Sequence, residues 1–90
     1  MTAISVTAGH IAAGERDNCE ECPIALAIME AIPGACCVYV GYPTATIGMA
    51  DGGKTEVELP DDALAFIWDF DNRQTVKPFT FELDYTAVAA

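Results

Sequence analysis

The four cysteines are the residues of this sequence with the clearest chemical potential. Cys19 and Cys22 form a Cys-x-x-Cys pair directly before Pro23, which predicts a position at the start of a helix. Such a pair could act as a redox couple, because the N–H groups of a helix start lower the pKa of a thiol. Glu20 and Glu21 oppose thiolate formation, and the pair does not follow a strand of a βαβ unit. Redox catalysis is therefore poorly supported.

Zinc binding is a second interpretation of the same residues. Cys19 and Cys22 have the spacing of zinc ligands, and further ligands could come from Cys36, Cys37 or His10. A second Cys-x-x-Cys pair would make this signal strong, whereas adjacent cysteines and one distant histidine leave it weak. The simpler interpretation is structural: Cys22 caps the helix, and the adjacent pair Cys36 and Cys37 points to opposite faces of a strand. A Cys19–Cys22 disulfide would be an oxidised variant of this arrangement.

No other group of residues predicts catalysis. His10 is the only histidine, and its place in a short predicted helix favours a packing or capping role over that of a general base. The only serine is Ser5, so a serine–histidine–acid triad has little support. Asp69-Phe70-Asp71 would bind a divalent ion only if other oxygens converged on it. We expect no catalytic residues, no cofactor apart from the zinc alternative, and no enzymatic activity.

The charge of the chain excludes several classes of partner. Fourteen acidic residues against four basic ones give a formal net charge of −10 over 90 residues. Without a basic surface the chain is not expected to bind nucleic acid directly or to dock on anionic lipid. A solubilising acidic surface is the simplest explanation. The sharper alternative is DNA mimicry, in which carboxylates take the place of phosphates in the groove of a DNA-binding enzyme.

The compartment is predicted from what the sequence does not contain. The start, residues 1–5, has neither the positive region nor the apolar run of a secretory peptide. The longest apolar run, Pro23 to Ile32, is too short to span a bilayer. We therefore expect a cytoplasmic protein, without contact to a membrane, whose thiols are reduced or metal-bound rather than linked as a disulfide framework.

Two helices and a strand are the clearest elements that would position these residues. Pro23 to Ile32 begins with a proline at a first helical position and ends at Pro33-Gly34, and its apolar side chains predict burial on most sides. Asp61 and Asp62 open a second helix with apolar residues at i, i+3, i+4 and i+7, and Trp68 beside this stripe. The segment 79–85 alternates apolar and acidic or hydroxyl residues, as a half-buried strand does.

The remaining segments complete a small α+β domain. A strand signal over residues 4–7 and a short helix over 8–15 come first, and three strands over 36–42, 45–50 and 55–59 form a meander. The order β-α-α-β-β-β-α-β predicts a single domain over residues 1–90, with a mostly antiparallel sheet of four or five strands and helices packed on one face. The other face would carry four acidic side chains into solvent: Glu56, Glu58, Glu82 and Asp84.

Several short motifs are spread over most of the chain. They are His10-Ile11-x-x-Gly14, Cys19-x-x-Cys22-Pro23-Ile24-Ala25-Leu26-Ala27, Leu59-Pro60 before Ala63 and Phe66-Ile67, and Phe70-Asp71 with Val76-x-Pro78-Phe79-x-Phe81. In this pattern the sequence resembles a family of short proteins of unassigned activity encoded by bacteriophages of actinobacteria and related prophages. The resemblance implies a viral protein made in the cytoplasm of an infected bacterium, and it brings no catalytic residues with it.

A non-enzymatic binding protein is the function that these observations favour. We expect it to bind a host or phage protein as a regulatory or host-interaction factor. Surplus apolar surface on a domain of this size would mark an interface, often between two copies, so a homodimer is also expected. The alternatives are a zinc-stabilised module that uses Cys19 and Cys22, and an acidic DNA mimic that inhibits a host DNA-binding enzyme.

Overall fold

The structure is a computed structural model that describes residues 2–16, 18–41 and 43–85. Within these ranges the elements follow the predicted order closely, and their ends differ from the predicted ones by a few residues. Tyr42, the last residue of one predicted strand, lies outside the described residues. The elements are β1 (Thr2–Val6), α1 (Ala8–Ala13), α2 (Pro23–Ala31), β2 (Ala35–Gly41), β3 (Thr44–Met49), β4 (Lys54–Glu58), α3 (Asp61–Asp71) and β5 (Phe79–Leu83).

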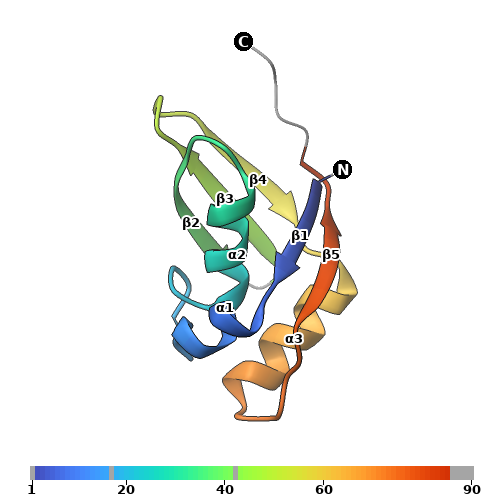
Figure 1. The fold of residues 1–90 in the computed structure, drawn as a ribbon. Helices are drawn as coiled ribbons and strands as arrows, with labels where there is room; N and C mark the ends of the chain where they lie inside the picture. Colours follow the sequence, from blue (N-terminus) through green and yellow to red (C-terminus); the bar gives the residue numbers. More distant parts are fainter. Residues whose placement is uncertain (1, 17, 42, 86–90) are drawn as a thin grey trace.

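The described strands form two antiparallel sheets (Figure 1). β2, β3 and β4 form the predicted meander, and β1 pairs with β5 from the far end of the described chain. The α+β class and the antiparallel pairing are confirmed, but the strands are divided between two sheets instead of sharing one. Alternation of side chains in a sequence specifies which face of a strand is buried and carries no information about which strands pair. The division was therefore outside what periodicity could predict.

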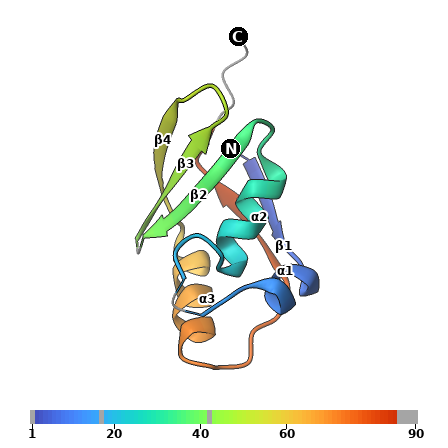
Figure 2. The ribbon, with the colours of Figure 1, turned by 90° about the vertical axis from the view of Figure 1, so that its left-hand side faces the viewer.

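Helix α2 lies at the centre of the molecule and contacts both β1 and β2 (Figures 1 and 2). Ile24 and Ile28 are fully buried and Ile32 almost so, as their i, i+4, i+8 spacing predicts. Full burial of an isoleucine side chain contributes roughly 1.5–3 kcal/mol to folding, so this stripe is a main source of stability. α2 therefore packs against strands as predicted, whereas α3 lies beyond the strand ends, in the lower part of Figure 1.

Aromatic side chains join α3 to β5. The Phe66 and Phe79 rings stack with their centroids 4.9 Å apart, and Phe79 and Phe81 follow at 5.5 Å. Offset stacking of this kind adds to the burial of apolar area. The four carboxylates that were predicted to point into solvent are all exposed: Glu56, Glu58, Glu82 and Asp84. Their predicted exposure is thus confirmed, but they belong to two separate sheets instead of one face of a single sheet.

Length and hydropathy of the helices bear on membrane contact. In residues 2–16, 18–41 and 43–85, no helix combines the length and the apolar character needed to cross a bilayer.

Candidate functional site

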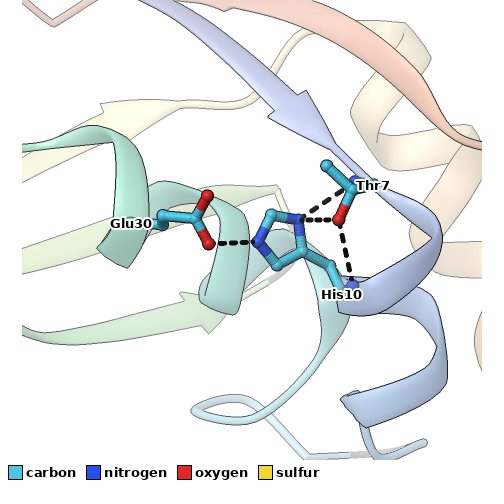
Figure 3. Close-up of polar contacts among 3 residues, drawn as sticks. All are labelled: Thr7, His10 and Glu30. Carbon is cyan, nitrogen blue, oxygen red and sulfur yellow. Dashed lines mark hydrogen bonds and ion pairs between the residues drawn. The ribbon is translucent and has the colours of Figure 1, made fainter.

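His10 is held by a reciprocal cap at the start of α1 (Figure 3). The Thr7 hydroxyl accepts a hydrogen bond from the His10 backbone N–H at 3.2 Å, and the Thr7 backbone N–H donates to His10 Nδ1 at 3.0 Å. Glutamate or glutamine is the usual third residue of such a box, and here the imidazole takes that role. The predicted capping role of His10 is confirmed.

The other imidazole nitrogen reaches across to α2. His10 Nε2 lies 2.9 Å from Glu30 Oε2 (Figure 3). Because a backbone N–H can only donate, Nδ1 must accept, and the neutral ring therefore carries its proton on Nε2 and donates it to Glu30. The His10 side chain is 10% exposed and that of Glu30 is 74% exposed, so one partner is inside the fold and the other at its surface.

Thr7, His10 and Glu30 have the residue types of a hydroxyl–imidazole–carboxylate triad, but their hydrogen bonds differ from those of a nucleophilic site. The Thr7 hydroxyl lies 3.2 Å from His10 Nδ1, but Nδ1 also accepts the Thr7 backbone N–H, and the hydroxyl accepts a bond from the His10 backbone. A general base needs a nitrogen free to take the proton of the nucleophile. The arrangement therefore connects the junction between β1 and α1 to α2, and we assign it a structural role.

Cys22 caps α2, as the structural interpretation predicts. Its Sγ accepts a hydrogen bond from the Ala25 backbone N–H at 3.4 Å, and Pro23 occupies the first helical position. Burial raises the pKa of the Cys22 thiol and outweighs the lowering effect of the hydrogen bonds from Ala25 and Ile24. A redox pair needs a thiol with a lowered pKa, so this change runs against the redox interpretation.

Cys19 is exposed and lies beside the outer face of the three-stranded sheet. Its backbone carbonyl accepts a hydrogen bond from the Val40 N–H at 2.7 Å, which attaches the loop before α2 to β2. A side-chain hydrogen bond with Cys19 raises the pKa of the Tyr39 hydroxyl, because the bond favours the protonated form. The two members of the Cys-x-x-Cys pair thus have different surroundings, one at the surface and one in the core.

Cys36 and Cys37 differ from the prediction. Ala35 pairs with Met49 and Cys37 with Gly48, so Cys36 is the extra residue of a β-bulge. Regular alternation would place one thiol on each face, but the bulge leaves both thiols exposed, with their Sγ atoms 3.8 Å apart. The expectation of one cysteine on each face was therefore wrong, because a bulge interrupts the two-residue period on which it relied.

These placements bear on the zinc alternative. His10 faces Thr7 and Glu30, Cys22 is the buried cap of α2, and Cys36 and Cys37 lie together in the bulge. In the part of the chain that the structure describes, no group of three or more histidine, cysteine, aspartate or glutamate side chains is placed to hold a metal ion. The structure does not bring the predicted ligands together as one tetrahedral set.

Trp68 is the feature that the sequence reasoning missed. The prediction placed it beside the buried stripe of α3, yet its side chain is 65% exposed, while Phe66 and Phe70 are buried. Residues two positions apart on a helix do not share a face. Trp68 lies two residues from both phenylalanines, and this spacing was the signal that could have placed it at the surface.

A shallow hollow of about 280 Å³ lies between α3 and the segment before β5, and Trp68 is not part of its lining. Ala65 belongs to its lining and is three residues before Trp68, so the hollow and the indole are neighbours on the helix surface. Its lining combines apolar side chains with charged ones: Asp62, Ala65, Phe66, Asp69, Thr75, Val76, Lys77 and Phe79. An apolar surface with acidic side chains is suited to binding a partner.

Comparison with known proteins adds no relative from which a function could be transferred. No protein-family model matches the chain, and the searches of curated proteins and of solved structures found no significant match.

Proposed function

We propose that this protein is a small non-enzymatic binding domain of a bacteriophage or prophage, which binds a host or phage protein in the host cytoplasm. The observation that carries this proposal is the exposure of Trp68, whose side chain is 65% accessible on α3. Tryptophan is enriched among the residues that dominate binding energy at protein interfaces, because its large apolar ring also carries a hydrogen-bond donor. The phage origin rests on the sequence resemblance alone.

The surface around Trp68 has the composition of a binding site. Phe66 and Phe79 contribute apolar area to the adjacent hollow, and Asp62 and Asp69 lie one on each side of Ala65 along the helix. A partner could place an aliphatic side chain against the apolar part and a cation near the carboxylates. Arginine or lysine beside an apolar residue has both features, and a cation can also lie over the indole face.

The charge of the whole chain points to a partner other than a second copy. A symmetric dimer brings the same patch of both copies together, so Asp62 and Asp69 of each copy would face carboxylates of the other. With a net charge of −10, two copies also repel at long range. We therefore propose a basic protein surface as the occupant, and a homodimer through this face is the less favoured alternative.

A capture experiment with one matched pair of variants tests the proposal. The tagged chain, Trp68→Ala and Tyr39→Ala would each be incubated with actinobacterial lysate and washed at low and high salt. Among the described residues, Tyr39 is the other exposed large apolar side chain, 52% accessible on a different element, so its variant controls for general loss of aromatic surface. We expect a partner that the parent chain and Tyr39→Ala retain and that Trp68→Ala loses.

Fluorescence then measures the same interaction with the purified partner. Trp68 is the only tryptophan of the chain, so its emission reports on this surface alone. Binding should shift the emission of the parent chain to shorter wavelength and protect it from quenching by acrylamide. Trp68→Ala has no tryptophan, so its affinity is measured by titration calorimetry, and we expect it to bind about 30-fold or more weakly, as loss of a hot-spot residue does. Equal capture by the parent chain and Trp68→Ala would overturn the proposal. DNA mimicry would be favoured instead if the captured proteins bind DNA, stay bound at low salt but not at high salt, and are retained equally by the parent chain and Trp68→Ala.

A further inference from the structure

Two exposed thiols lie side by side at the start of β2, and the proposed binding surface on α3 does not use them. Cys36 Sγ and Cys37 Sγ are 3.8 Å apart, and both residues are exposed. In a regular strand, neighbouring side chains point to opposite faces, so adjacent cysteines do not act together. The β-bulge at Cys36 removes this restriction. The fold thus converts two consecutive residues into a dithiol with both sulfurs accessible from solvent.

The strand next to the bulge leaves space for the sulfurs. Gly48 of β3 pairs with Cys37, and a Cβ atom at this position would overlap Cys37 Sγ and come within 4.0 Å of Cys36 Sγ. Only glycine lacks this atom, so the close approach of the thiol to β3 depends on Gly48. The space that Cys37 Sγ occupies is therefore left open by the backbone of β3, and any larger residue at position 48 would displace the sulfur.

The charges around the thiols favour a cation. Asp51 lies close enough to Cys36 for its negative charge to act on the sulfur. Glu20 lines the same hollow as Cys37, together with Tyr39 and one basic side chain, Lys54. Acidic neighbours make a pair of bare thiolates unfavourable, and a divalent ion that replaces the two thiol protons leaves the net charge of the site unchanged.

We propose that Cys36 and Cys37 form a chelating site for a soft, thiol-binding metal or metalloid ion. Thiolate sulfur selects such ions over hard cations such as Mg²⁺ and Ca²⁺. The sulfur separation fits, because ligands about 2.3 Å from a tetrahedral metal lie about 3.8 Å from each other, close to the 3.8 Å observed. When a divalent ion binds, two S–H bonds break, two metal–sulfur bonds form and two protons leave to solvent, with no change of oxidation state.

Phenylarsine oxide is the probe for this site, because trivalent arsenic forms a stable cyclic product only with two neighbouring thiols. Each arsenic forms two As–S bonds, and its oxygen leaves as water with the two thiol protons. The reduced chain has four thiols. We expect intact mass spectrometry to show one arsenical per chain and a thiol assay to detect two remaining thiols. A dithiol should release the arsenical, whereas an equal concentration of a monothiol should not.

Single serine variants assign the pair. Cys36→Ser and Cys19→Ser each retain three thiols, so they differ in which pair remains and not in thiol number. Both residues are exposed, and folding of each variant would be checked by circular dichroism. We expect Cys19→Ser to keep the chelated arsenical and both Cys36→Ser and Cys37→Ser to lose it. Retention of the adduct by Cys36→Ser, its loss in Cys19→Ser, or no chelation by the parent chain would overturn the proposal.

Discussion

His10 uses three hydrogen-bonding atoms to join three segments of the chain. Nδ1 and the backbone N–H close the cap with Thr7, and Nε2 donates to Glu30 on α2. The hydrogen bonds with Thr7 are made by His10, which is mostly buried, whereas the Glu30 carboxylate is largely exposed to water. A hydrogen bond to an exposed partner contributes little, because water replaces the partner when it is removed. The cap should therefore account for most of the stabilisation by His10.

Substitution of His10 separates these two contributions. His10→Ala removes the acceptor of the Thr7 N–H and should lower the free energy of unfolding by about 1–2 kcal/mol. His10→Gln supplies the usual third residue of a capping box and should recover part of that loss. Glu30→Ala, the control, should change stability by less than about 0.5 kcal/mol. Urea denaturation measures all three variants, and equal losses for His10→Ala and Glu30→Ala would show that the link to α2 is the main contribution.

At the scale of elements, the sequence predicts best where one periodicity runs through a whole segment. In α2 the spacing of Ile24, Ile28 and Ile32 indicates both the helix and its buried side, and the structure confirms both. In β5 the alternation does the same, with Phe81 and Leu83 buried. The structure of such a segment can be predicted from its own sequence, because burial of one face is the main source of its stability.

The parts that could not be predicted depend on contacts between segments. Pairing of β1 with β5, which divides the strands into two sheets, is a property of two distant segments. The bulge at Cys36 arises from the register between β2 and β3, which neither strand contains by itself. The same distinction applies to the candidate sites. The caps at His10 and Cys22 could be predicted from local sequence, whereas the dithiol and the hollow near Trp68 depend on contacts between segments and could be seen only in the structure.

Substitution of two glycines in or next to helices by alanine should change the free energy of unfolding in opposite directions. Gly34 follows α2 with a φ of +83°, and a Cβ there would lie 3.2 Å from Met49 Cε. An L-residue in this conformation is disfavoured by about 1–2 kcal/mol, so Gly34→Ala should lower the free energy of unfolding by about that amount. Gly9 lies inside α1, and its nearest contact would be Thr7 Oγ1 at 3.5 Å.

Gly9→Ala therefore replaces the more flexible residue in a helix without a clash and should raise stability by up to about 1 kcal/mol. Urea denaturation of both variants against the parent chain tests the pair, with the slope of the transition compared to confirm that the unfolded states are similar. A loss of stability in Gly9→Ala, or no loss in Gly34→Ala, would contradict the backbone argument for the respective position.

At the scale of the whole molecule, the net charge of −10 opposes folding and favours a basic partner. Folding brings the carboxylates of β4 and β5 onto the surface of one small domain, where they repel each other more than in the extended chain. Salt screens this repulsion, since the Debye length falls from about 30 Å at 0.01 M to about 8 Å at 0.15 M. The same screening weakens attraction to a basic protein, so stability of the free chain and affinity for the partner should change with salt in opposite directions.

Thermal unfolding in increasing sodium chloride tests this consequence. We expect the melting temperature to rise by several degrees between about 0.02 M and 0.3 M salt, with most of the change at the low end, where screening changes fastest. The double variant Glu56→Gln and Glu82→Gln removes two exposed charges without changing side-chain size, and its salt dependence should be smaller. Sucrose, which stabilises by exclusion from the protein surface and does not screen charge, should raise the melting temperature of both proteins equally. A melting temperature that stays constant or falls as salt is added would contradict this argument, because favourable local charge pairs would then outweigh the net repulsion. The acidic surface would in that case have to be explained by its effect on the partner alone.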